Sequence, residues 1–406
     1  MEDNKKRTFS IFGPGMIITA SFIGPGTVTT MTQGGAGFGY SLLWAVIFSI
    51  IATMALQEMV ARLALVTNEG LGEAIRDIFN HHLLKIITVW FSMIAVAVGC
   101  AAYISGDLLG TSLGAAYLIG VPEHAIAPII GIIILCIGLI GSYALIEKVM
   151  TVLVLVMGVI FITTVIIIQP DFTAVLKGAF IPSIPDGSIL TIIALIGTTV
   201  VPYNFFIHAN SIHERFNGPE DLRAVRFDTI LAIALGGIIS AAILITAGTL
   251  IEGKEVSSLV ELSEPLKPIL GDFAPLFMSI GLFSAGLSSA IASPMGAAAT
   301  ISSCLRWKGG VKSKKYRLVF AIVIFIGIIT SSLGFEPLEV LLLAQALNGI
   351  ILPIIAILIF VILNKKNMMG KFANSFVLNI IAIFVVLVVS FLGIYSLVDA
   401  IQGFIS

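Results

Sequence analysis

The chain has 406 residues, of which 58% are hydrophobic and only 11% carry a charge. Together with a mean hydropathy of +1.10, this composition excludes an ordinary soluble enzyme. The net charge of −1 points to no particular partner, and we expect none that is a nucleic acid. Apolar stretches of about 20 residues recur along the whole chain, which predicts an all-α protein that crosses a lipid bilayer many times. The first stretch follows a charged start and has no cleavage site, so no signal peptide is expected.

Eleven membrane spans are predicted. They cover residues 11–36, 41–66, 86–120, 124–145, 149–168, 188–213, 227–251, 272–304, 318–334, 337–362 and 374–402. With these spans, 19 of the 22 Lys and Arg residues fall on the side of the N-terminus and 3 on the other side. Because basic residues concentrate in cytoplasmic loops, we expect the N-terminus to be cytoplasmic and the C-terminus to be outside, in a plasma (inner) membrane.

The first span is interrupted in its middle by Gly24, Pro25 and Gly26, and Thr27 follows directly. Proline removes a backbone donor, and glycine lowers the cost of leaving helical dihedral angles. Within a bilayer such a break survives where the freed backbone groups line an enclosed cavity, which is typical of a transporter's substrate site. The alternative is a kinked but continuous helix.

The sixth span contains a second interruption at Pro202, with Thr198 before it and Asn204 after it. Interrupted segments at corresponding positions of two halves indicate the substrate site of a transporter. The two breaks lie five spans apart, and an odd number of spans per half inverts the second half. We therefore expect one transport domain over residues 1–406, with a first inverted repeat at 11–168, a second at 188–362 and an extra helix at 374–402.

These residues resemble the NRAMP (natural resistance-associated macrophage protein) family of divalent metal transporters. The family reads D-P-G-N where this chain has Gly24, Pro25, Gly26 and Thr27. Further matches, spread over nearly the whole chain, are Gln33, Gly35, Gly39, Tyr40, Leu42, Leu43, Trp44, Ala61, Arg62, Leu63, Val66, Thr67, Gly286, Ser288, Ser289 and Pro353. The resemblance implies a leucine-transporter-like fold, with two inverted repeats of five helices and an eleventh helix, and secondary-active transport by alternating access.

The chain departs from the family pattern in the site itself. Gly24 and Thr27 stand where the family has the aspartate and asparagine that grip the metal. Val201 replaces a methionine, Tyr203 replaces a histidine, and Thr198 corresponds to an alanine whose carbonyl helps to bind metal. Acidic residues of the family are also missing at Thr29, Met31 and Gly110. The family residues that are kept are Asp107, Asn204, His208 and Gln345.

Two substrates remain open for this altered site. A divalent cation, Mg²⁺ or Mn²⁺, would meet Thr27, Thr198 and Gln345 in a neutral cavity and would keep part of its water, which suits Mg²⁺. Alternatively, a small polar or carboxylate-bearing solute such as an amino acid would bind at the free N–H groups of the half-helix that starts at the break. The substrate-binding set in either case is Gly24, Gly26, Thr27, Thr198, Val201, Tyr203, Asn204 and Gln345.

Two ionisable residues lie inside predicted spans, Asp107 in the third span and His208 in the sixth, six residues beyond Pro202. Intramembrane carboxylates are costly and are usually functional, so we expect these two to relay a proton or an ion. Their alternatives are a hydrogen-bonded carboxyl and a core histidine. No catalytic or phosphate-binding motif appears in the sequence, which argues against an enzyme, and we expect no resident cofactor.

Overall fold

The computed structural model describes residues 14–140, 144–212, 216 and 218–405. Its longer helices are α1 (Pro14–Phe22), α2 (Pro25–Phe38), α3 (Leu43–Thr67), α5 (His82–Ile119), α6 (Glu123–Ile140), α7 (Ala144–Ile168), α8 (Phe172–Phe180), α9 (Ile189–Thr199), α10 (Pro202–Ser211), α11 (Leu222–Leu250), α14 (Ala274–Cys304), α15 (Lys314–Ser331), α16 (Pro337–Asn364) and α18 (Phe376–Ile405). Shorter helices are α4 (Leu71–Asp77), α12 (Leu259–Ser263), α13 (Lys267–Leu270) and α17 (Lys366–Met369). Within these described ranges the chain forms no strand.

Each predicted span corresponds to a helix or to a pair of helices. The first span is divided into α1 and α2, and the sixth into α9 and α10. Among the residues that the structure describes, seven helical segments are long and apolar enough to cross a membrane. They are Leu43–Thr67, His82–Ile119, Ile189–Ser211, Pro219–Leu250, Leu259–Cys304, Pro337–Asn364 and Phe376–Tyr395. The fold is thus a multi-pass helical membrane architecture.

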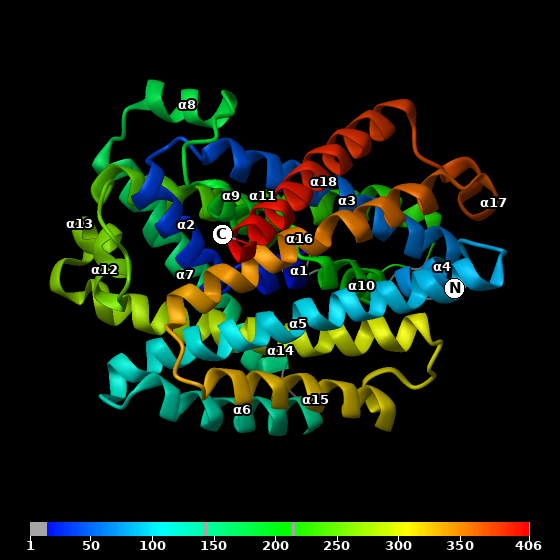
Figure 1. The fold of residues 1–406 in the computed structure, drawn as a ribbon, viewed down its shortest axis with the longest axis horizontal. Helices are drawn as coiled ribbons and strands as arrows, with labels where there is room; N and C mark the ends of the chain where they lie inside the picture. Colours follow the sequence, from blue (N-terminus) through cyan, green and yellow to red (C-terminus); the bar gives the residue numbers. More distant parts are fainter. Residues whose placement is uncertain (1–13, 141–143, 213–215, 217, 406) are drawn as a thin grey trace, which may run out of the picture.

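Helices at corresponding positions of the two halves pack against each other. In Figure 1, α5 and α14 run side by side, and α6 lies beside α15 at the edge of the molecule. The second helices of the two halves, α3 and α11, are also in contact, while α18 packs on α16. This pairing of equivalent helices is the arrangement of a leucine-transporter-like fold, with two inverted repeats of five helices followed by an eleventh.

Glycines let these helices approach closely, as small residues do in membrane bundles. A methyl group on Gly35 of α2 would lie 2.8 Å from both the Ala247 Cβ and the Gly248 backbone nitrogen of α11. At Gly37, on the exposed side of the same helix, a methyl group would meet nothing within 4 Å. Alanine substitutions at the two positions therefore distinguish the effect of helix propensity from the effect of packing between helices.

We predict that Gly35→Ala destabilises the protein and that Gly37→Ala does not. Overpacking against a backbone that cannot yield costs about 1–3 kcal/mol, and the gain in helix propensity offsets at most about 1 kcal/mol of this. Thermal unfolding of the purified protein in detergent measures both effects. Equal melting temperatures for Gly35→Ala and the Gly37→Ala control would contradict the close α2–α11 contact.

Candidate functional site

The first break lies between α1 and α2, at Ile23 and Gly24. Gly24 has φ −116° and ψ −174°, an extended conformation, and Pro25 occupies the first turn of α2, where a missing N–H costs nothing. The Phe22 carbonyl, freed by the break, accepts hydrogen bonds from the Gly24 N–H at 3.0 Å and from the Thr27 hydroxyl. The predicted interruption is confirmed, but Gly26 already belongs to α2.

The second break lies between α9 and α10, at Val200 and Val201. Val201 is extended, with φ −84° and ψ 118°, and precedes Pro202 at the start of α10. Its carbonyl accepts from the Asn204 N–H at 3.1 Å, and the Thr199 carbonyl accepts from the Thr53 hydroxyl of α3 at 3.3 Å. The side chain of Val201 is buried and brings no polar atom to the site.

Hydroxyl groups join the two breaks directly. The Thr27 and Thr198 hydroxyl oxygens lie 2.8 Å apart, and because Thr27 donates to Phe22, Thr198 is the donor in this pair. The Ser21 hydroxyl of α1 donates to the Asn204 Oδ1 of α10 at 2.7 Å. The breaks therefore face each other, as the sequence predicts, and each half-helix is tied to one from the other repeat.

A carboxylate also lies at the first break. Asp107 of α5 is fully buried, and its Oδ2 accepts a hydrogen bond from the Ser289 hydroxyl of α14 at 2.7 Å. A methyl group on Gly24 would lie 3.6 Å from the Asp107 Oδ1 and 3.1 Å from the Ser289 Oγ. A neighbouring helix thus places an ionisable carboxyl group beside Gly24, which the expected set of hydroxyl, amide and carbonyl groups did not include.

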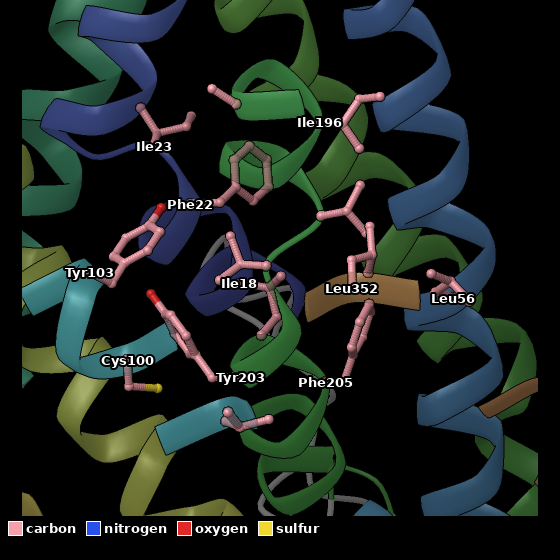
Figure 2. Close-up of a cluster of buried hydrophobic side chains, with 14 of the residues drawn as sticks. Ile18, Phe22, Ile23, Leu56, Cys100, Tyr103, Ile196, Tyr203, Phe205 and Leu352 are labelled. Atoms are coloured by element: carbon pink, nitrogen blue, oxygen red, sulfur yellow. The ribbon is translucent and has the colours of Figure 1, made fainter. Parts of the chain in front are cut away.

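Two tyrosines and a glutamine complete the polar environment. Tyr103 and Tyr203 pack edge to face, with ring centroids 5.6 Å apart, and Figure 2 shows both side chains beside the broken helices. The Tyr103 hydroxyl lies near Thr198 and Gln345, and the Tyr203 hydroxyl lies near Asp107 and Ser289. The Gln345 amide of α16 abuts Gly26, where any side chain would overlap it.

Several of these buried polar atoms lack a hydrogen-bond partner among the residues that the structure describes. They are Asp107 Oδ1, Tyr103 OH, Tyr203 OH, Asn204 Nδ2, and Gln345 Oε1 and Nε2. A buried polar group without a partner costs about 1–3 kcal/mol, and native proteins rarely leave several together. This concentration of polar groups makes the region between the two breaks the candidate site for a polar or charged ligand.

His208 of α10 lies apart from Asp107 in the hydrogen-bond network. Its Nδ1 is 2.8 Å from the Gln57 Oε1 of α3, and its Nε2 has no partner among the described residues. The Asp107 side chain instead accepts a hydrogen bond from Ser289. The structure thus places the two relay candidates in separate contacts, and a proton relay through them stays a prediction.

A buried ion-pair cluster was missed by the sequence reasoning. Glu58 of α3 pairs with Arg62 at 3.1 Å and with Arg226 of α11 at 2.7 Å. Arg62 also donates to the Asn374 Oδ1 at 2.7 Å and to the Phe372 carbonyl. The i, i+4 spacing of Glu58 and Arg62 inside an apolar span was the available signal.

Tyr103 and Ser289 were also missed as site residues. Tyr103 stands four residues before Asp107 on the same helix, so helical spacing alone places both on one face. No such rule brings Ser289 to Asp107, because the two residues belong to different repeats and are 182 positions apart in the chain.

Two broken helices that face each other between inverted repeats define a membrane transporter. The chain belongs to the family described as natural resistance-associated macrophage protein-like, whose sequence model matches residues 15–399.

Among its relatives are the divalent metal cation transporters MntH of Yersinia pestis and Pectobacterium carotovorum. The first is 28% identical, with 97% of this chain and 96% of the relative covered. The second is 29% identical, with 98% and 97% covered.

Solved structures show the same fold. A mutant form of the Eremococcus coleocola manganese transporter matches with a TM-score of 0.79 at 19% identity, covering 100% of this chain and 90% of that one. A nucleobase–cation symporter, Mhp1, captured in a closed conformation, matches with a TM-score of 0.57 at 16% identity, covering 96% and 93%. At these identities the likeness concerns the fold alone.

We predict that Thr27 and Thr198 are energetically coupled. Thr27→Val and Thr198→Val each remove the hydroxyl pair, so the double variant should lose less stability than the sum of the single variants. The difference should be about 0.5–1.5 kcal/mol, the net value of one hydrogen bond. Thr164, whose hydroxyl bonds within α7 at 2.9 Å, is the control. Chemical unfolding measures the change in the free energy of unfolding for each variant. If the changes for Thr27→Val and Thr198→Val add as fully as those for Thr27→Val and Thr164→Val, the hydroxyl bridge does not contribute to stability.

Proposed function

We propose that this protein is a secondary-active transporter of a divalent cation, with Mg²⁺ or Mn²⁺ as substrate, that works by alternating access. The single observation that carries the proposal is the cluster of unpaired, buried oxygen-bearing groups where the two helix breaks meet. Membership of a family whose relatives are named divalent metal cation transporters supports the same substrate class. Transport of this kind uses no resident cofactor and no catalysis.

The donor set favours a hard cation. Thr27, Thr198 and Gln345 offer oxygen atoms, and carboxylate, carbonyl and water oxygens are the ligands that Mg²⁺ and Ca²⁺ prefer. Val201 brings no thioether sulfur, which would favour softer transition metals. Among the described residues, no three His, Cys, Asp or Glu side chains come together. We infer that the cation retains part of its water shell, because so few charged groups are available to replace it.

The site residues belong to a closed state. Thr27, Thr198, Asp107 and Gln345 are all 0% exposed. Alternating access requires that one repeat moves relative to the other around a fixed central site, and the breaks supply a substrate site at the contact between the repeats. We infer that the state described here lies between the two open states.

The orientation and membrane of the protein are part of the proposal. The excess of Lys and Arg on one side of the predicted spans supports a cytoplasmic N-terminus and an external C-terminus. A plasma membrane agrees with the transport role. A reporter enzyme fused to the C-terminus that is active only outside the cell tests the orientation.

The carboxylate-bearing solute is the second candidate, and the extended Gly24 at the N-terminus of α2 is the observation that favours it. Asp107 weighs against it, because its carboxylate lies beside the position where the substrate anion would sit. Like charges at such a distance repel each other strongly when they are buried.

Uptake into proteoliposomes decides between the two candidates. The purified protein is reconstituted and presented with Mg²⁺, Mn²⁺, Ca²⁺ and Cd²⁺ and with a panel of amino acids. We expect saturable uptake of a divalent cation. Saturable uptake of an amino acid without any response to the cations would overturn the proposal in favour of the second candidate.

We predict that Mn²⁺ has little advantage over Mg²⁺, less than about tenfold in affinity or about 1.4 kcal/mol, because Val201 offers no sulfur. Val201→Met should raise the affinity for Mn²⁺ and Cd²⁺ but not for Mg²⁺. Val201→Leu, of similar size but without sulfur, is the matched control. Calorimetric titration of each ion measures the ratio.

A larger preference of the unaltered protein for Mn²⁺ or Cd²⁺ would reveal another soft ligand. Cys100 lies one turn before Tyr103 on α5 and is buried, and Figure 2 shows it beside the two tyrosines. If Cys100→Ser abolished such a preference, the oxygen-only description of the site would be wrong.

A further inference from the structure

We propose that Asp107 is the anionic ligand of the substrate cation, contacting it directly or through one water molecule, and that it takes the part that an acidic side chain at position 24 would otherwise play. This inference deepens the proposed function and rests on it. It gives Asp107 an equilibrium binding role that differs from the relay of protons.

The Asp107 carboxyl group lies beside Gly24 at the first break. One oxygen of Asp107, Oδ2, is held by the Ser289 hydroxyl at 2.7 Å, which fixes the orientation of the group. The other oxygen, Oδ1, is buried, has no partner among the described residues, and lies 3.6 Å from where a methyl group on Gly24 would be. The Asp107 carboxyl group of α5 therefore lies beside the point from which a side chain at position 24 would extend.

The side chains around Asp107 include no cationic partner among the described residues. Ser289, Tyr203 and Tyr103 are polar side chains near it, and the Thr111 hydroxyl donates to its backbone carbonyl at 2.5 Å. No salt bridge to Asp107 occurs among the described residues, and His208, the nearest titratable base on α10, is bonded to Gln57. A fully buried carboxylate without a cationic partner is unfavourable inside a membrane protein.

A divalent cation loses hydration energy when it enters the site. Moving a divalent ion from water into a cavity of hydroxyl and amide groups leaves much of its hydration energy unreplaced. A carboxylate at the site offsets this cost, and the bound cation in turn supplies the partner that Asp107 lacks. One interaction thus resolves both deficits. Gln345, which abuts Gly26, and Tyr203, which follows the second break, also carry polar atoms without a partner among the described residues.

The test transfers the carboxylate from α5 to the break. Mg²⁺ binding is measured by calorimetric titration in detergent at constant pH, for the wild type, Asp107→Asn, the exchange variant Gly24→Asp/Asp107→Asn, and the matched control Gly24→Ala/Asp107→Asn. Loss of a hydrogen bond or ligand contact from a charged group is worth about 1.5–3 kcal/mol, so Asp107→Asn should weaken Mg²⁺ binding by roughly ten- to a hundredfold. The exchange variant should recover binding, and the control should not.

Ser289→Ala provides a second route to the same question. Ser289 is a positioning residue, since its hydroxyl donates to the Asp107 Oδ2 and carries no charge of its own. Its removal should weaken Mg²⁺ binding several-fold, in the same direction as Asp107→Asn. Melting temperature and elution volume on size exclusion verify that each variant is folded, and Ser289→Ala serves where Asp107→Asn does not fold.

The outcomes separate this inference from the proposed function. If the folded wild type binds neither Mg²⁺ nor Mn²⁺, the proposed function fails. If the wild type binds Mg²⁺ and Asp107→Asn binds it equally well but no longer transports it, Asp107 is a relay and the inference is overturned while the function stands. Unchanged binding in Ser289→Ala, or an exchange variant no better than its Gly24→Ala control, also overturns it.

Discussion

The fold depends on one constraint, which is that backbone groups freed by a broken helix inside a bilayer must find partners within the protein. At the first break, the Phe22 carbonyl is satisfied by the Gly24 N–H and the Thr27 hydroxyl. The same hydroxyl reaches Thr198, so one side chain both repairs the local loss and fixes the second broken helix.

Much of the architecture could be predicted from the sequence because hydropathy and helix breakers act locally. The eleven apolar stretches, and the interruptions near Pro25 and Pro202, depend only on neighbouring residues, and the structure has helices and breaks there. The exact residues of the first break differ by one or two positions, because Pro25 is well tolerated in the first turn of α2.

The composition of the site was harder to predict because it depends on contacts between distant helices. The resemblance to the family implies that an acid is missing at Gly24, but it cannot show that Asp107, 83 positions later, lies beside that residue. His208 illustrates the same limit, since its partner Gln57 lies on another helix, 151 positions away in the chain. Periodicity places residues on a helix face, whereas only tertiary packing decides which faces meet.

The Glu58 cluster has a mechanical consequence. Glu58 and Arg62 belong to α3, in the first repeat, while Arg226 belongs to α11, the equivalent helix of the second. Arg62 also holds Asn374, at the entrance to α18. The buried Glu58 carboxylate pairs with a guanidinium group from each half, and Arg62 extends this link to the segment just before α18. A movement of one half against the other must therefore either keep the Glu58–Arg226 ion pair, with α3 and α11 turning about it, or break it.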